Sequence, residues 1–118
     1  MSKILLIEDE EVTYRTLMGR LQAQGHDVVL ATDGESALSC LTDNSLNLII
    51  MDWMIPGSDA IEMLKENKKA AKTPVIILTS KRVSFDRDLC LMHGAKAYLN
   101  KPVDFKDLSE AIGKYLKV

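Results

Sequence analysis

Several features that mark specialised protein classes are scarce in this 118-residue sequence. Its 2 cysteines, Cys40 and Cys90, lie far apart and lack the paired spacing of a zinc or redox motif. No stretch approaches the roughly 18 consecutive apolar residues of a membrane span, and acidic residues follow the first apolar run, where a signal peptide would still be apolar. We therefore expect a cytoplasmic protein with no membrane contact, in which both cysteines are small, reduced core residues.

A strong excess of one charge is missing as well. The 15 basic and 17 acidic residues give a formal net charge of -2, too little for a domain that holds nucleic acid through bulk positive charge. We therefore expect no direct nucleic-acid partner. The two halves nevertheless differ, because residues 1–62 carry 3 basic and 11 acidic residues, whereas residues 63–118 carry 12 and 6. This difference predicts two solvated faces of opposite sign.

The sequence does contain the composition of an ordinary folded domain. Apolar residues make up 47% and charged residues 27%, and the length suits one domain over residues 1–118. Five short apolar runs without polar alternation predict strands that are covered on both faces. They occupy residues 4–7, 28–31, 48–51, 75–78 and 97–99.

Segments with helical periodicity separate these runs. Tyr14, Leu17 and Leu21 follow the spacing of one helix face, and Gly25 marks a stop after them. Further helices are predicted after Asp33, around residues 61–64, between Ser84 and Gly94, and after Asp104 as an N-cap. Strict alternation predicts an α/β fold, an open, doubly wound (βα)5 domain with a five-stranded parallel sheet. Ligands of such sheets bind beyond the carboxyl ends of the strands.

Residues with useful chemistry follow four of the predicted strands. Glu8 and Asp9 follow the first, Asp52 the third, Thr79 the fourth and Lys101 the fifth. Three carboxylates that converge on one edge repel one another, and a hard divalent cation with oxygen ligands, Mg²⁺ in a phosphate site, relieves this repulsion. A lysine and a hydroxyl group beside them suit an incoming phosphoryl group, with Asp52 as the nucleophile.

Each of these signals taken alone has a simpler interpretation. A strand-end aspartate is often a helix cap, threonine favours strands, and Lys-Pro is common in turns. Glu10 and Glu11 fit the start of a helix, and His26 and His93 fit surface positions at helix ends. The phosphoryl site is predicted because independent signals coincide at one edge.

Four segments of the chain, ILLIEDE, MDWMIPG, LTS and YLNKP, together resemble the receiver domains of two-component response regulators, including the stand-alone chemotaxis type. The resemblance spans residues 3–117 and implies the flavodoxin-like strand order 2-1-3-4-5. It also implies that Asp52 is phosphorylated, that Thr79 and Lys101 contact the phosphoryl group, and that Tyr98 is an aromatic switch residue.

The resemblance further implies a set of Mg²⁺ ligands. These are Asp9, Asp52 and the backbone carbonyl of Met54, with Glu8 acting largely through water. The bond between Lys101 and Pro102 is expected to be cis.

The implied function is a phosphorylation-activated signalling switch. A histidine kinase or a phosphotransfer protein donates the phosphoryl group in a Mg²⁺-dependent reaction, and the domain later dephosphorylates itself. It is thus no conventional enzyme, because it acts only on its own side chain. Phosphorylation shifts a population of states and changes the face of the fourth helix, fifth strand and fifth helix, which an output protein or domain contacts.

Two departures from the family pattern bear on these expectations. Residues 56–60 read PGSDA in place of the usual segment, so the loop before the third helix is expected to differ in shape. Lys96 and Ala97 stand where many DNA-binding regulators carry two aspartates. Because the usual ion pairs of that face are lost, we expect a monomer or a weak, phosphorylation-dependent dimer.

Two alternative functions remain open at this stage. A small phosphatase with an aspartate nucleophile needs a second aspartate two residues later as a general acid, and Met54 occupies that position. A phosphorylation-independent scaffold of the same fold would not need the intact set of acceptor, acids, hydroxyl and lysine. A flavin site is not supported, because no Gly-rich phosphate loop follows the first strand.

Overall fold

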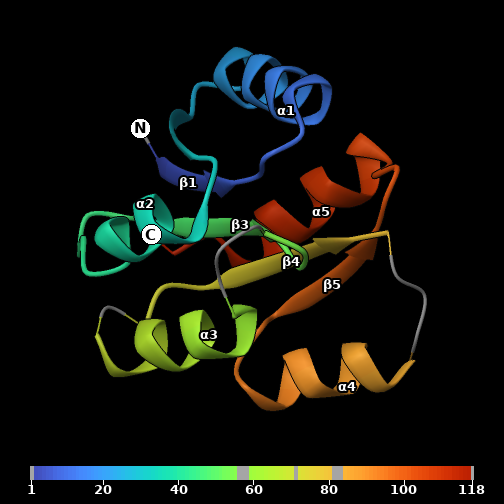
Figure 1. Ribbon diagram of the computed structural model, residues 1–118. Coiled ribbons are helices and arrows are strands. Elements are labelled where there is room, and N and C mark those ends of the chain that lie inside the picture. Colours follow the sequence, from blue (N-terminus) through green and yellow to red (C-terminus); the bar gives the residue numbers. More distant parts are fainter. Residues whose placement is uncertain (1, 56–58, 71, 81–83, 118) are drawn as a thin grey trace.

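Strands and helices alternate along the whole described chain (Figure 1). The computed structural model describes residues 2–55, 59–70, 72–80 and 84–117. The strands are β1 (Lys3–Ile7), β2 (Asp27–Ala31), β3 (Leu48–Asp52), β4 (Val75–Thr79) and β5 (Ala97–Asn100). The helices are α1 (Glu11–Ala23), α2 (Gly34–Cys40), α3 (Ala60–Lys69), α4 (Ser84–Met92) and α5 (Phe105–Tyr115). The first and last residues of each predicted apolar run lie within one residue of the ends of an observed strand.

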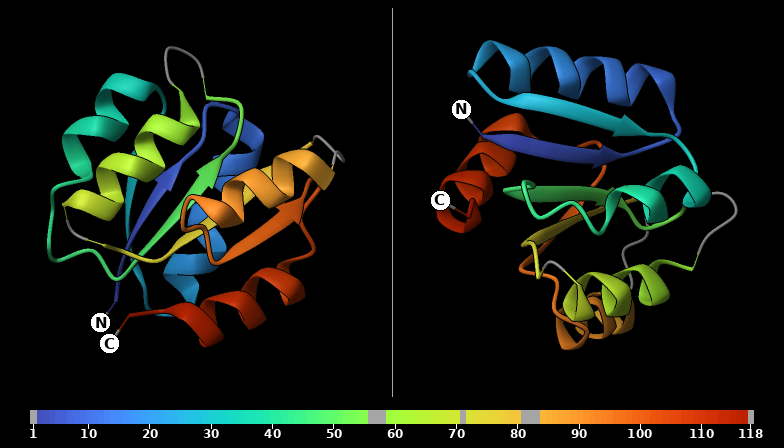
Figure 2. Two further views of the ribbon diagram at one scale, coloured as in Figure 1. Left: turned by 90° about the horizontal axis from the view of Figure 1, so that it is seen from below. Right: turned by 90° about the vertical axis from the view of Figure 1, so that its left-hand side faces the viewer.

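The five strands form one parallel sheet in the order β2-β1-β3-β4-β5. Figure 2 shows helices on both sides of it, with α1 and α5 on one face and α2, α3 and α4 on the other. The order reverses between β1 and β3, which pair directly although β2 lies between them in the chain. The fold is therefore the predicted open, doubly wound α/β domain of flavodoxin-like strand order.

Two hydrophobic cores lie on opposite faces of the sheet because successive strand side chains point to opposite sides. Leu5 and Ile7 of β1 pack into the core beneath α2, α3 and α4. Ile4 and Leu6 pack into the core beneath α1 and α5, where they meet Leu17. The absence of polar alternation in the sequence reflects this double coverage, and β3 and β4 are buried throughout.

Short polar side chains fix the starts of three helices. Asp33, Asp59 and Asp104 each accept a hydrogen bond from a backbone N–H in the first turn of the following helix. Gly25 and Gly94 follow the ends of α1 and α4 with positive φ angles of 91° and 104°, which glycine adopts without a steric penalty. The cap at Asp59 was not predicted, and the preceding residues 56–58, where a different loop shape was expected, lie outside the described residues.

The chain ends meet at the edge of the sheet remote from the carboxyl ends of the strands. The side chain of Asn47 accepts a hydrogen bond from the Lys3 N–H at 2.8 Å and donates one to the Lys117 carbonyl at 2.8 Å. Cys90 is fully buried and Cys40 half-buried, and neither forms a disulfide. Among the described residues, no helix has the length and apolar character that crossing a membrane requires.

Candidate phosphoryl-acceptor site

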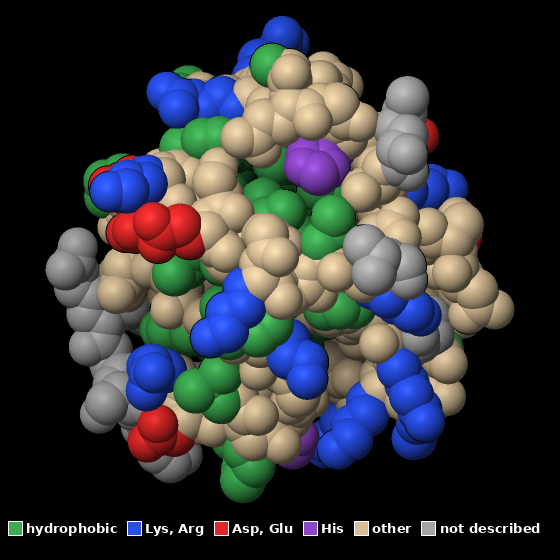
Figure 3. Space-filling view, turned by 180° about the vertical axis from the view of Figure 1, so that it is seen from behind, with side chains coloured by type: hydrophobic (Ala, Val, Ile, Leu, Met, Phe, Trp, Pro, Cys, Tyr) green, Lys and Arg blue, Asp and Glu red, His purple; other side chains and the backbone are tan. Residues whose placement is uncertain are grey.

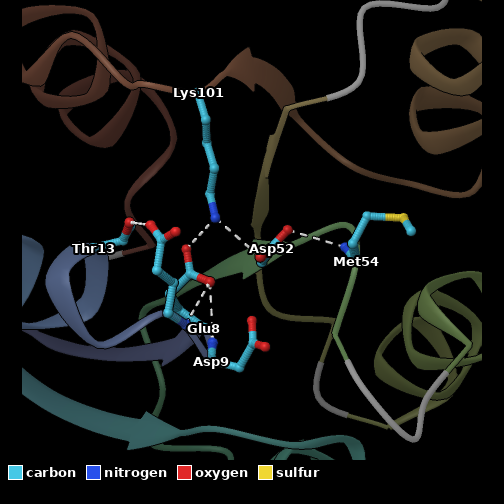
Figure 4. Close-up of polar contacts among 7 residues, drawn as sticks. Glu8, Asp9, Thr13, Asp52, Met54 and Lys101 are labelled. Atoms are coloured by element: carbon cyan, nitrogen blue, oxygen red, sulfur yellow. Dashed lines mark hydrogen bonds and ion pairs between the residues drawn. The ribbon is translucent and has the colours of Figure 1, made fainter.

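The carboxyl ends of β1, β3 and β5 bring most of the predicted site residues together (Figure 4). Glu8 and Asp9 directly follow β1, Asp52 is the last residue of β3, and Lys101 directly follows β5. The register places Asp52 opposite Leu78, one residue before Thr79. Charge is costly in the buried interior of a strand, so these charged side chains lie at the strand ends or directly after them.

Asp52 lies at the centre of the site and both its carboxylate oxygens have partners. Oδ2 is 3.0 Å from the Lys101 ammonium, and Oδ1 accepts a hydrogen bond from the Met54 N–H at 3.0 Å. The residue is only 6% exposed, so its neighbours restrict access to the carboxylate. These contacts fix the carboxylate in one orientation, as a reacting nucleophile requires.

Glu8 is fully buried beside Asp52 and shares its cation. Its Oε1 pairs with the Lys101 ammonium, and its Oε2 accepts a hydrogen bond from the Asp9 N–H at 3.0 Å. A single lysine thus joins the ends of β1 and β3 through two carboxylates. The sequence predicted the three residues at one edge but not this sharing, which depends on the length and path of the lysine side chain.

The pKa values of the three groups depart from their ordinary values because of burial and mutual contact. Burial, followed by the hydrogen bond with Asp52, raises the pKa of Glu8 to about 7, and Lys101 offsets only part of this. Burial also acts to raise the pKa of Asp52, but contacts with Glu8, Met54 and Lys101 outweigh it and lower that pKa. For Lys101, burial acts to lower the pKa, and the two carboxylates outweigh it and raise the value.

The acidic residues have the chemistry of a hard-cation site. Oxygen atoms of Glu8, Asp9 and Asp52 lie within 4.8 Å of one another. Asp9 is exposed and forms no ion pair with another described residue, so its charge faces the mouth of the site. Clustered carboxylate oxygens are what Mg²⁺ selects in proteins. The Met54 side chain is 55% exposed, and a contribution from its backbone carbonyl stays a prediction.

The two predicted switch residues lie behind and beside this cluster. Thr79 is fully buried at the end of β4, and its carbonyl accepts a hydrogen bond from the Lys101 N–H at 2.7 Å. Tyr98 lies on β5 opposite Ile77 and is half-buried against the core beneath α3 and α4. The bond between Lys101 and Pro102 is cis, as expected. The roles of Thr79 and Tyr98 themselves stay predictions.

A groove of about 930 Å³ lies between Asp52, α1 and the start of α5. Asp52 and Lys101 line it, together with Thr13, Thr16 and Arg20 of α1. The Arg20 guanidinium lies 4.9 Å from the centre of the Phe105 ring and so joins α1 to α5. Sequence reasoning assigned no role to these positions and did not predict the groove. A possible signal was the apolar Val12, 76% exposed among acidic residues, which also lines the groove.

A family model described as the response regulator receiver domain matches residues 4–113 of the chain. The chain belongs to this family. It is 39% identical to the transcriptional regulatory protein CpxR of Klebsiella pneumoniae over 99% of its length, which is 50% of that protein. It is 34% identical to the alkaline phosphatase synthesis transcriptional regulatory protein PhoP of Bacillus subtilis over 98% of the chain and 48% of that protein. The receiver domain therefore spans about half the length of the curated relatives that it matches.

Solved structures of receiver domains share its fold. One from Clostridium thermocellum has 33% identity and a TM-score of 0.89, with 98% of this chain and 94% of that chain covered. The receiver domain of the sensor histidine kinase PA1611 from Pseudomonas aeruginosa has 28% identity and a TM-score of 0.86, with 97% and 96% covered. That structure is described with a magnesium ion coordinated in its active-site cleft. The resemblance predicted from the sequence motifs is thus confirmed.

Proposed function

We propose that this receiver domain, taken as one unit over residues 1–118, is switched by phosphorylation of Asp52. The observation that carries the proposal is a carboxylate at the end of β3 that is oriented by Lys101 at 3.0 Å and by the Met54 N–H at 3.0 Å. It lines a groove of about 930 Å³, which is large enough for a protein side chain to approach. Among the described strand ends, the end of β3 combines a nucleophilic carboxylate, the fixed cation of Lys101 and a groove through which a donor can approach.

The proposed reaction moves one phosphoryl group between side chains. A carboxylate oxygen of Asp52 attacks the phosphorus of a phosphohistidine, a P–O bond forms, and the P–N bond breaks with its electron pair returning to the imidazole. Lys101 stays beside the acceptor, where its charge stabilises the negative charge on the phosphoryl oxygens. Hydrolysis of the acyl phosphate by water later returns Asp52 and inorganic phosphate.

The carboxylates fit a magnesium ion, as their spacing within 4.8 Å indicates. Asp9 and Asp52 would hold it directly, with the Met54 carbonyl, and Glu8 through water. When bound, Mg²⁺ supplies positive charge that draws carboxylate and phosphoryl oxygens together. Glu8 and Asp9 fix the other side of the pocket, because the Glu8 carboxylate accepts the Asp9 N–H and so holds the turn after β1.

The groove beside α1 is the proposed docking site of the phosphoryl donor. Receiver domains of response regulators accept phosphoryl groups from histidine kinases, and we propose a histidine kinase or a phosphotransfer protein as the partner here. Thr13, Thr16 and Arg20 would contact it, because they line the path that leads to Asp52. Such partners act in the cytoplasm, where we place this domain.

The output face is proposed to comprise α4, β5 and α5. Thr79 lies next to the acceptor strand, and Tyr98 lies on the neighbouring strand within the same sheet. A phosphoryl group on Asp52 would draw the Thr79 hydroxyl toward it and favour an inward position of Tyr98. The changed face would then bind an output protein or domain, which experiment has to identify. The curated relatives are about twice as long as this chain.

The alternative of a small phosphatase receives no support from the site. Its general acid would have to occupy the position of Met54, whose thioether side chain cannot donate a proton. The alternative of a phosphorylation-independent scaffold does not explain why two carboxylates and a lysine share a buried site. Removing these charges from water costs folding free energy, and a scaffold would gain no function in return.

The test is incorporation of a single phosphoryl group. Wild-type protein with acetyl phosphate and Mg²⁺ should gain the mass of one phosphoryl group that is labile to hydroxylamine, whereas Asp52→Asn should gain none. Asp27→Asn is the matched control, because Asp27 is an exposed aspartate at the opposite edge of the sheet and should leave labelling unchanged. Labelling of Asp52→Asn at the wild-type level would contradict the proposal.

A further inference from the structure

A second, smaller pocket lies at the edge of the sheet opposite Asp52. It has a volume of about 280 Å³ and lies between the end of α3, the segment before β4 and the turn between α4 and β5. Lys68, Lys72, Lys96 and His93 lie around it, together with Thr73. Figure 3 views the molecule from behind, where Lys and Arg side chains gather over the lower right part of the surface. The pocket shares no lining residue with the groove at Asp52, so the two sites are separate.

Uncompensated positive charge surrounds the pocket. No carboxylate lines it, and none of its three lysines forms an ion pair with another residue in the described part of the chain. Lysines in the last turn of a helix also complement the helix dipole, which accounts for Lys68. Lys96 comes from a different element, after α4, so the dipole of α3 does not explain its presence here. Three like charges around one concave site favour an anion with more than one negative charge.

A buried hydroxyl group is the second, independent observation. Thr73 lines the pocket and is only 3% exposed, and its Oγ1 makes no hydrogen bond with another described residue. The backbone of the same residue is fully engaged, because the buried Asn67 side chain donates to the Thr73 carbonyl at 2.7 Å and accepts from the Thr73 N–H at 3.2 Å. The fold thus holds Thr73 in place but leaves its hydroxyl group without a partner, which is costly in a buried position.

We propose that this pocket binds a phosphate group, with the lysines supplying charge and the Thr73 hydroxyl donating a hydrogen bond. The ligand is a small tetrahedral oxyanion with two negative charges, either inorganic phosphate or the phosphate of a phosphorylated small molecule. Lysine and a hydroxyl group together match the oxygens of such an anion. Binding is non-covalent and does not involve Asp52, so the proposal stands or falls independently of the phosphorylation switch.

The experiment is a titration of the metal-free protein with inorganic phosphate at constant ionic strength, followed by the amide resonances in NMR spectra. We expect saturable shifts of the Thr73, Gly94 and Lys96 amides, with a dissociation constant of about 1 mM or tighter. The Trp53 amide next to the acceptor should stay unmoved, and Asp52→Asn should bind equally well. Shifts that fail to saturate by 20-fold above that concentration, or that chloride reproduces, would overturn the proposal.

Two variants with the same loss of charge separate a built site from diffuse attraction. Lys68→Gln with Lys96→Gln should weaken phosphate binding at least tenfold. Lys69→Gln with Lys114→Gln removes two exposed lysines that do not line the pocket, and it should change binding less than twofold. Equal losses in the two double variants would mean that only the net charge matters, and the site would be refuted.

Thr73→Val tests the hydroxyl group, because valine keeps the shape and removes the donor. Phosphate affinity should fall severalfold while the melting temperature stays constant or rises, since a buried hydroxyl without a partner is lost. Unchanged affinity would overturn its assignment as a ligand. A parallel titration with glycerol phosphate identifies the source: tighter binding of the ester indicates a phosphorylated small molecule, and tighter binding of the inorganic ion indicates free phosphate.

Discussion

At the scale of single residues, the acceptor site is a balance between three carboxylates and one ammonium group. Lys101 contacts both Glu8 and Asp52, so the positive charge is divided between two acids. Asp9 has no such partner among the described residues and adds negative charge at the mouth. The metal-free site therefore carries unrelieved repulsion, which a divalent cation would remove.

This imbalance predicts that Mg²⁺ stabilises the fold. A hundredfold excess over the dissociation constant contributes about 2.7 kcal/mol by linkage, which raises the melting temperature by roughly 10 °C for a domain of this length. Asp9→Asn should raise the metal-free melting temperature by a few degrees and lose most of the response to Mg²⁺. Differential scanning calorimetry measures both. A wild-type transition that millimolar Mg²⁺ leaves in place would count against the metal site.

Trp53 offers an optical readout because it directly follows Asp52 and no other tryptophan is present. It is half-buried against the core beneath α2, α3 and α4, and its backbone N–H donates to the Leu78 carbonyl at 2.8 Å. Mg²⁺ should change its emission saturably, and beryllofluoride should change it further only after Mg²⁺ is present. Asp9→Asn should respond to Mg²⁺ far more weakly than wild type, and equal responses would mean that the emission reports ionic strength alone.

At the scale of helices and strands, most of the fold could be predicted from the sequence. The apolar runs predicted all five strands because burial on both faces removes polar residues, and Asp104 and Gly94 marked helix ends by their capping chemistry. Two contacts were not predictable from the sequence. They are the ion pairs of Lys101 with both Glu8 and Asp52, and the Asn67 clamp, the pair of hydrogen bonds from the Asn67 side chain to the Thr73 backbone. Each joins residues whose contact depends on the final packing.

The start of β1 is tied to the turn after α2 by a polar cluster that predicts an acid dependence. The Lys3 ammonium, 2.8 Å away, and then the Ser45 side chain and N–H hold the pKa of Asp43 well below its ordinary 3.8. The stabilisation is therefore present above about pH 4 and is lost as the pH falls further. Asp43→Asn should lower stability at neutral pH and flatten its loss below pH 4, measured by urea unfolding.

The matched control for this change is Asp88→Asn, which neutralises an exposed aspartate on α4. It should leave both the neutral-pH stability and the slope below pH 4 as in wild type. An identical acid profile for Asp43→Asn and wild type would show that the contacts of Asp43 contribute nothing to folding.

The Asn67 clamp predicts a large cost for a small substitution. Asn67→Ala removes two hydrogen bonds from the buried backbone of Thr73 and should lower the free energy of unfolding by about 1–3 kcal/mol. Lys69→Ala, at an exposed position two residues later in α3, should change it by less than about 0.5 kcal/mol. Chemical denaturation of both variants decides the matter, and equal costs would refute the clamp.

At the scale of the whole molecule, one acidic and one basic cluster lie at opposite ends of the strands. The acidic residues Glu8, Asp9 and Asp52 gather where the strands end, and Lys68, Lys72 and Lys96 gather near where they begin. Because the two halves of the chain interleave in space, this separation arises from the topology and not from two separate lobes. The two clusters thus offer charged partners sites of opposite sign at opposite ends of the sheet.

The charges of β5 and its neighbourhood predict weak self-association. Lys96 precedes β5 and Lys114 lies on α5, both exposed and both positive. We expect sedimentation velocity to give the 13.2 kDa mass of a monomer without a phosphoryl donor, and at most a weak dimer with acetyl phosphate and Mg²⁺. A stable dimer in the absence of any phosphoryl donor would contradict this expectation.

The hydrogen bonds of Asn47 have a practical consequence for optical reporters. Because Lys3 and Lys117 bind the same side chain, the two ends of the described chain lie next to each other, at the edge remote from Asp52. Donor and acceptor fluorophores attached at these ends would therefore keep a high transfer efficiency in every state of the switch and report nothing about it. The same adjacency allows a short linker to join the ends, so a circularly permuted chain with new termini beside the moving face is the better architecture for a sensor.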